Sequence, residues 1–278
     1  MYKGFLIHFS FFVFLFLTII GCQSENEAPQ IGNEGMLEIA LYNKLHHFQS
    51  KTERNLFREN NIRSVSFVRH IVSESKVDSA TFLKIDEKGR IISKTTNECT
   101  TVGCLPYTIR QDYEYDNDKI IRMDDFTFKK KYKNILSYWN ENDTSKLSKF
   151  EWEDYSYKND TTIVESATQR WIYTYDLQGR VMSKFTDIKM NEQYIKVNYS
   201  YEPVKIKQSL INDYMKSYHQ TEYVISSPNT VTYTDNYNTD KVRKKLFIFN
   251  INGLLSNIKG YLNDTLMVDT KISYDTAK

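Results

Sequence analysis

The sequence of 278 residues contains little of what enzyme sites and metal centres are built from: it has 3 Cys, 5 His, 9 Gly and 4 Pro. It has no Cys/His array with zinc spacing, no Walker-type loop and no Gly-x-Ser-x-Gly nucleophile elbow. Lys and Arg total 37 against 35 Asp and Glu, and this net charge of +2 is far from the basic excess of a nucleic-acid binder. We therefore expect no metal, cofactor, nucleic-acid partner or catalytic residue, and no enzymatic activity.

Aromatic residues are abundant instead. The chain has 21 Tyr, 16 Phe and 3 Trp, while 40% of all residues are hydrophobic and 26% are charged. Such a composition can bury a core and argues against broad disorder. The length corresponds to one large domain or two small ones.

Residues 1–21 have the features of a signal peptide. One basic residue precedes an apolar run over residues 5–20, which is too short for a comfortable membrane span. The run ends in the tetrapeptide IIGC, whose last residue is Cys22, and this ending resembles the lipobox of bacterial lipoproteins. The resemblance implies cleavage before Cys22, acylation of Cys22 and a lipid anchor in the outer membrane. The alternative is an ordinary secretory signal with a chance cysteine.

Residues 22–33 form a polar segment, which we interpret as a flexible tether behind the lipidated cysteine. Its acidic residues, Glu25 and Glu27, are similar to the surface-export signal of Bacteroidota lipoproteins. The alternative is a solvated spacer. Both the periplasmic and the surface face of the outer membrane therefore stay open as locations.

Residues 34–61 predict one N-terminal helix. An apolar stripe with steps of mostly three and four residues is typical of an amphipathic helix. The stripe consists of Leu37, Leu41, Leu45, Phe48 and Leu56. The pattern also allows a break into two helices near Ser50. We expect this element to cover only part of the sheet that follows.

Residues 62–278 alternate with a period of two. Aromatic pairs such as Tyr113/Tyr115 and Tyr199/Tyr201 lie on one face of an extended strand, and β-branched residues are frequent between them. Turn-rich stretches separate the strands. The sequence therefore predicts a mainly β fold, an antiparallel β-meander of repeated hairpins in an open or partly curled sheet.

One turn pattern recurs along this region: Asp or Asn is followed by Gly three residues later. The side-chain oxygen of the first residue accepts a backbone N–H, and Gly adopts the positive φ of the turn. The predicted turn residues are Asp86 with Gly89, Asp176 with Gly179, and Asn250 with Gly253. The repeated register favours a recurring hairpin.

The segment Tyr173–Val181 reads Tyr-x-Tyr-Asp-x-x-Gly-Arg-Val and resembles a YD repeat of RHS-type proteins and many Bacteroidota surface lipoproteins. The other copies are eroded and irregularly spaced, so a large closed RHS shell is not implied. The resemblance implies hairpin architecture and a surface location, but it brings no catalytic residues.

Cys99 and Cys104 bracket a short loop. An even pair of cysteines in an exported protein predicts a disulfide, with free thiols as the alternative. A zinc site would need two further ligands, and a CxxC redox motif needs two intervening residues where this pair has four.

Three functions are compatible with these features. The first is a non-enzymatic binding or structural lipoprotein whose Tyr-rich sheet contacts an unknown protein or glycan partner. The second is a lipid or lipoprotein carrier or chaperone, in which the helix covers a half-barrel. The third is a polysaccharide hydrolase. A carrier needs an apolar cavity, and a hydrolase needs two acids that converge in a cleft.

Overall fold

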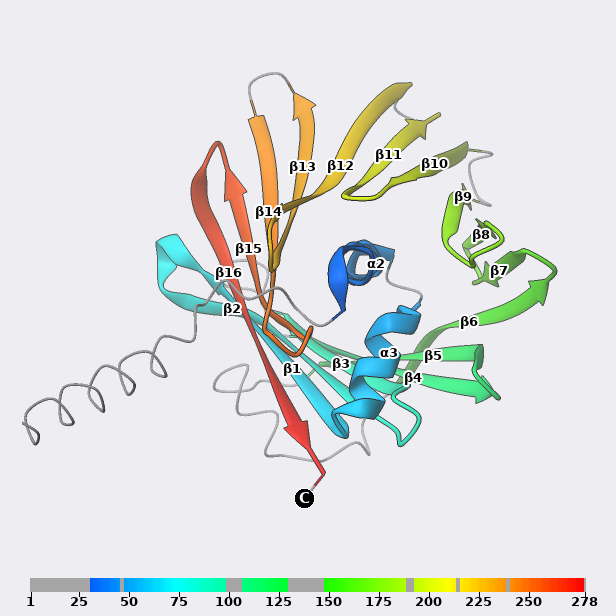
Figure 1. Ribbon diagram of the computed structural model, residues 1–278. Helices are drawn as coiled ribbons and strands as arrows, with labels where there is room; N and C mark the ends of the chain where they lie inside the picture. Colours follow the sequence, from blue (N-terminus) through cyan, green and yellow to red (C-terminus); the bar gives the residue numbers. More distant parts are fainter. Residues whose placement is uncertain are drawn as a thin grey trace, which may run out of the picture.

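The computed structural model describes residues 31–45, 48–98, 107–129, 148–188, 193–213, 216–238 and 241–277. In these ranges sixteen antiparallel strands follow one another in chain order and close into one barrel (Figure 1). The predicted meander of hairpins is confirmed. The open or partly curled sheet is wrong, because the first strand pairs with the last from Ile62–Thr276 to Ile71–Val268.

The strands are between 5 and 12 residues long. They are β1 (Ile62–Ile71), β2 (Lys76–Ile85), β3 (Ile91–Glu98), β4 (Tyr107–Asp116), β5 (Lys119–Lys129), β6 (Ser148–Lys158), β7 (Thr161–Glu165), β8 (Gln169–Tyr175), β9 (Val181–Ile188), β10 (Gln193–Glu202), β11 (Lys205–Asn212), β12 (Ser217–Ser227), β13 (Thr230–Asn238), β14 (Lys241–Phe249), β15 (Leu255–Leu262) and β16 (Thr265–Thr276). A short 3₁₀ turn, η1 (Val72–Glu74), joins β1 to β2.

Two helices precede the strands, α2 (Gly32–Leu45) and α3 (Lys51–Glu59). A single helix over 34–61 is therefore wrong, and the alternative of two helices with a break near Ser50 is confirmed. The Oγ atom of Ser50 accepts a hydrogen bond from the backbone N–H of Glu53 at 2.9 Å. This N-cap satisfies one of the free N–H groups of a new helix and fixes the start of α3.

Helix α2 lies inside the ring of strands (Figure 1). It is buried around most of its circumference. The buried residues are Gly35, Met36, Leu37, Ile39, Ala40, Leu41 and Leu45. The expectation that the helix covers one side of an open sheet is wrong, because a closed ring of sixteen strands encloses more space than its own side chains fill. A helix that is apolar on most sides fills this space, which we call the lumen.

The tyrosine-rich face of the strands points into the lumen. Tyr173 and Tyr223 are fully buried, and Tyr233 is 5% exposed. Phe48, which follows α2, makes an edge contact with Tyr173 at a centroid distance of 4.8 Å, and Tyr223 contacts Tyr233 at 4.9 Å. These rings form the core and not the exposed contact surface that the first of the three functions assumes.

Candidate functional site

The three predicted turns have the same backbone geometry. Gly89, Gly179 and Gly253 have φ values of +77°, +80° and +78°. The Oδ1 atom of Asp86 accepts from the N–H groups of residues 88 and 90 at 2.9 Å each, and Asp176 binds residues 178 and 180 in the same way. At the third turn the Oδ1 atom of Asn250 accepts from the N–H of residue 254 at 3.0 Å. These six residues have a structural role at the ends of hairpins.

Each turn is held by a tyrosine that the sequence analysis did not assign. The hydroxyl of Tyr115 donates to the carbonyl of Ile91 at 2.8 Å, and Tyr201 binds Val181 O in the same way at 2.7 Å. Tyr274 donates to the carbonyl of Leu255 at 2.7 Å. The sequence signal that could have found them is a Tyr in the strand pair after each turn Gly. These tyrosines lie 24, 20 and 19 residues after the residue whose carbonyl they bind. These three tyrosines therefore have a structural role at the turns.

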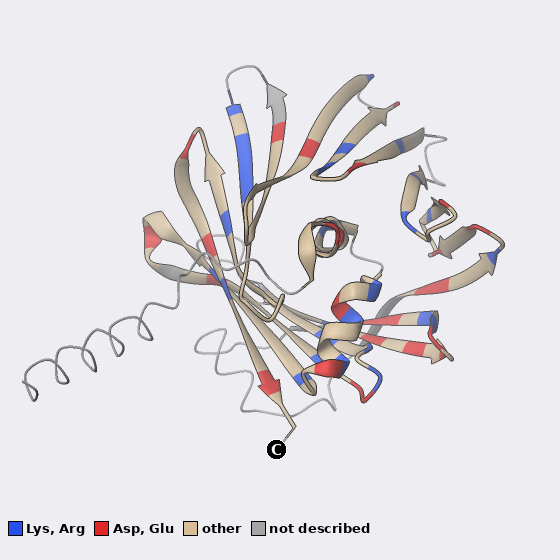
Figure 2. Ribbon diagram, viewed as in Figure 1, with Lys and Arg blue, Asp and Glu red and all other residues tan. Residues whose placement is uncertain are grey.

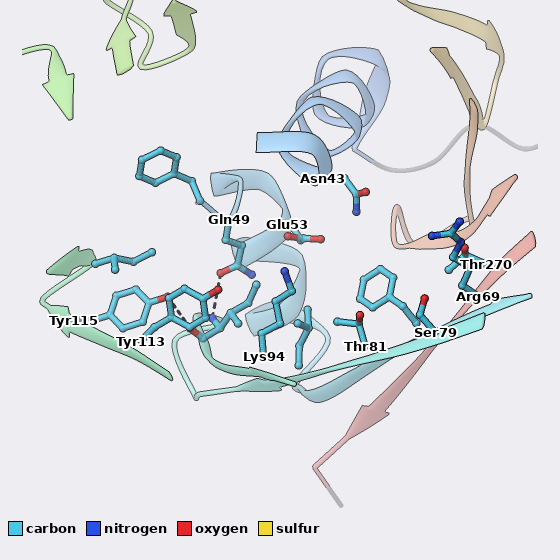
Figure 3. A pocket seen from close by; sticks show the side chains of 15 residues that line it. Asn43, Gln49, Glu53, Arg69, Ser79, Thr81, Lys94, Tyr113, Tyr115 and Thr270 are labelled. Atoms are coloured by element: carbon cyan, nitrogen blue, oxygen red, sulfur yellow. Dashed lines mark hydrogen bonds between the residues drawn. The ribbon is translucent and has the colours of Figure 1, made fainter. Parts of the chain in front are cut away.

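A cavity of about 360 Å³ lies inside the barrel, between the α2–α3 connection and the inner face of β1–β5 (Figure 3). One end is aromatic and apolar, with Tyr113 and Tyr115 next to Ile91 and Ile120. The opposite end is polar. Its polar residues are Arg69, Ser79, Thr81, Thr270 and, above them, Asn43, and Phe67 lies beside Thr81 as its register partner. The cavity therefore has two chemically different ends.

Glu53 and Lys94 lie between the two ends and point toward each other from α3 and β3 (Figure 3). Burial, together with the charge of Glu38, raises the pKa of Glu53 to about 7. Glu53 is the one carboxylate among the described residues that line this cavity. This lining thus lacks the pair of acids that a glycosidase uses.

A second cavity, of about 1110 Å³, lies beside the start of α2 and the Gly179 turn. Its acids have partners of their own. Glu38 accepts from the N–H of Lys51 at 3.1 Å and from the hydroxyl of Thr52, and Glu34 pairs with Arg180 at 3.7 Å. Glu34 is thus paired with a cation, whereas the partners of Glu38 are uncharged. The lining combines these acids with Lys51, Arg54 and Arg180 and has no single chemical preference.

The remaining predicted site residues, Cys22, Cys99 and Cys104, lie outside the described residues. Lipidation and the disulfide therefore stay predictions. Within the described ranges no helix is long and apolar enough to cross a membrane. The same ranges contain no group of three or more His, Cys, Asp or Glu residues placed to hold a metal ion.

In comparisons with known proteins, no protein-family model matches the chain, and no curated protein matches it significantly. The lumen and the sequence motifs are therefore the basis for a function.

Proposed function

We propose that this chain is a binding protein of the bacterial cell envelope that holds a small molecule in the lumen of its barrel. The β-barrel fold is compatible with a binding or carrier role. The single observation that carries the proposal is the cavity between the helices and β1–β5, which has an aromatic end and a polar end.

The cavity has the size and chemistry of a ligand site. Its volume of about 360 Å³ is within the range of small-molecule pockets, about 300–1,000 Å³. Aromatic walls supply contact area, and a few polar groups fix the orientation of a ligand. Two polar side chains in its middle, Glu53 and Lys94, favour a small polar or amphipathic molecule over a long acyl chain.

The location is part of the same proposal. The lipobox ending at Cys22 and the polar tether of residues 22–33 support attachment to the outer membrane by acyl chains. Radiolabelled palmitate should enter the wild-type protein in cells and should not enter Cys22→Ala. Labelling that survives the substitution would remove the anchor from the proposal.

Native mass spectrometry of the purified protein tests the lumenal site. We expect a small molecule to copurify with the wild type and to be lost from Thr81→Phe, because Thr81 lines the cavity and a phenyl ring fills it. Ile92→Phe is the matched control, since Ile92 is 39% exposed. Equal retention by Thr81→Phe and Ile92→Phe, or wild-type protein that never carries or binds a small molecule, contradicts the proposal.

A row of side chains on the outer face of the barrel favours a second function, which is contact with a protein or glycan partner. Strand register aligns Ile172, Phe185, Lys196, Ile211 and Tyr218 directly across β8–β12. Tyr218 is 59% exposed, and Ile211 is 39% exposed. A row that combines an exposed aromatic ring with exposed aliphatic surface is suited to recognition.

Capture from intact cells by immobilised protein tests this second function. Tyr218→Ala should lose the captured partner, whereas Val242→Ala, an exposed position on β14, should retain it. A partner held equally by both variants would assign the contact to another surface.

A further inference from the structure

The polar end of the lumenal cavity continues into a group of cations on three elements. Arg69 on β1 lines the cavity itself. Lys245 on β14 is the register partner of Tyr233 and Gly260, and it shares the inward face of the buried Tyr233. Lys44 is in the last turn of α2. Figure 2 shows the run of basic residues along β14.

These cations are close enough to disturb one another. The Nζ atom of Lys44 lies 3.4 Å from the centroid of the Tyr233 ring. Burial and the charge of Lys245 lower the pKa of Lys44 to about 7, against the opposing charge of Asp235. Burial and the charge of Arg69 also lower the pKa of Lys245. The helix C-terminus and the aromatic ring stabilise the Lys44 ammonium, but neither explains why Lys245 lies near Lys44 and Arg69 lies near Lys245.

The acidic residues nearby do not fully neutralise the positive charge of these three residues. The Nε atom of Arg69 lies 3.2 Å from Asp78, whereas Lys44 and Lys245 have no ion pair in the described part of the chain. Asp235 accepts a hydrogen bond from the Tyr233 hydroxyl, keeps its charge and offsets the charge of Lys44 in part, which leaves Lys245 without an acid among the described residues. An excess of positive charge in a concave, partly desolvated space attracts anions.

Gly260 leaves open space beside these cations. It lies inside β15 between Lys245 and Val268, and a Cβ atom at this position would meet only the Val268 Cβ, at 3.6 Å, and Val268 O, at 4.0 Å. Neither a tight contact nor a positive φ requires glycine here. Glycine weakens a strand interior, and it often marks a place where a ligand approaches the backbone.

Building on the lumenal binding function, we propose that the lumen takes a small organic anion. Its carboxylate or phosphate group lies among Lys44, Lys245 and Arg69, in the space that Gly260 leaves. Its apolar body enters the cavity toward Tyr113 and Tyr115. Lys245 keeps access to solvent although burial lowers its pKa, so the ligand enters past this side chain.

Titration calorimetry with octanoate, octanamide and inorganic phosphate tests the inference on the full-length protein stripped of any copurified molecule. Octanoate should bind more tightly than the neutral octanamide. Lys245→Met should weaken octanoate binding about tenfold, the typical effect of removing one charge-assisted hydrogen bond. Lys244→Met is the matched control, because the neighbouring lysine points to the opposite face of β14. Gly260→Val should weaken binding by filling the space, and thermal melting should show that all variants fold.

The outcomes separate this inference from the function on which it rests. Phosphate binding that is lost in Lys245→Met supports the cationic site and identifies the charged group as sufficient. Equal binding of octanamide and octanoate, or octanoate binding unchanged in both Lys245→Met and Gly260→Val, overturns the inference and leaves lumenal binding standing. Failure of all three probes to bind overturns the inference; a copurifying molecule lost from Thr81→Phe would still support lumenal binding.

Discussion

Two copies of the same turn have different neighbours in this barrel. At both Gly89 and Gly179 the φ angle, the Asp side-chain hydrogen bonds and the following Arg are alike. A Cβ atom added to Gly89 would overlap the backbone oxygen of Arg54 in α3, whereas one added to Gly179 would meet nothing within 4 Å. One turn is a docking point for a helix, and the other borders open space.

This difference between the two turns shows where α3 is attached to the barrel. The side-chain amide of Gln49 donates to Gly89 O at 3.0 Å and accepts from the N–H of Ile91 at 3.3 Å. Arg54 pairs with Asp118 at the β4–β5 turn at 3.4 Å. The Gly179 turn lines the cavity of about 1110 Å³ instead. Helix α3 is thus fixed to the early hairpins, whereas the second cavity borders the later copy of the turn.

The largest effect is expected at the docked turn. Gly89→Ala strains a residue at φ +77° and forces α3 away from the barrel, because the contact is with backbone and not with a movable side chain. Unfolding free energy should fall by about 3–5 kcal/mol, the sum of about 1–2 kcal/mol for the left-handed backbone and about 2–3 kcal/mol for the clash. Urea denaturation measures it. A loss of only about 1 kcal/mol would mean that α3 is not docked on this turn.

Gly253→Ala should have an intermediate effect. The new Cβ atom would lie 2.6 Å from the Ile31 side chain, which can move, and the residue keeps its φ of +78°. We expect a loss of about 2–3 kcal/mol. In the double variant with Ile31→Ala, the cost of Gly253→Ala should shrink to that of strain alone. A cost unchanged by Ile31→Ala would remove the steric part of this explanation.

The sequence predicts local structure here better than the arrangement of distant parts. Alternation and turn chemistry are local, so the strands and the turns at Gly89, Gly179 and Gly253 could be read from short segments. Closure of the barrel could not be predicted from short segments, because it depends on pairs such as Ser64 with Asp275, which are 211 residues apart. Alternation also separates two faces without stating which one encloses the helices, so the lumenal cavity was not foreseen.

Protonation of Glu53, which lies on the docked helix α3, should make the stability of the protein depend on pH. Its pKa of about 7 in the folded protein is above the usual value of 4.5, so folding is favoured by the protonated form. Stability should therefore decrease as pH rises from about 4.5 to 7, by about 2 kcal/mol, less than the full shift implies because the carboxyl group is partly exposed to the cavity. Glu53→Gln should remove this slope in urea titrations across pH, while Glu59→Gln, an exposed position on α3, should retain it. An unchanged slope in Glu53→Gln would assign the pH dependence to other groups.

Gly179→Ala should have the smallest effect of the series, about 1 kcal/mol, because only the backbone conformation at φ +80° opposes the new methyl group. Gly179→Asn tests this cause directly, since Asn tolerates the left-handed region and should cost less than Ala. The same Asn substitution at Gly89 should remain severe, because there the obstacle is the backbone of α3 and not φ. If Asn restores stability equally at both turns, the two copies are equivalent and α3 contributes nothing to the difference. If it does so only at Gly179, one short motif has two tertiary roles, and the packing of α3 decides between them.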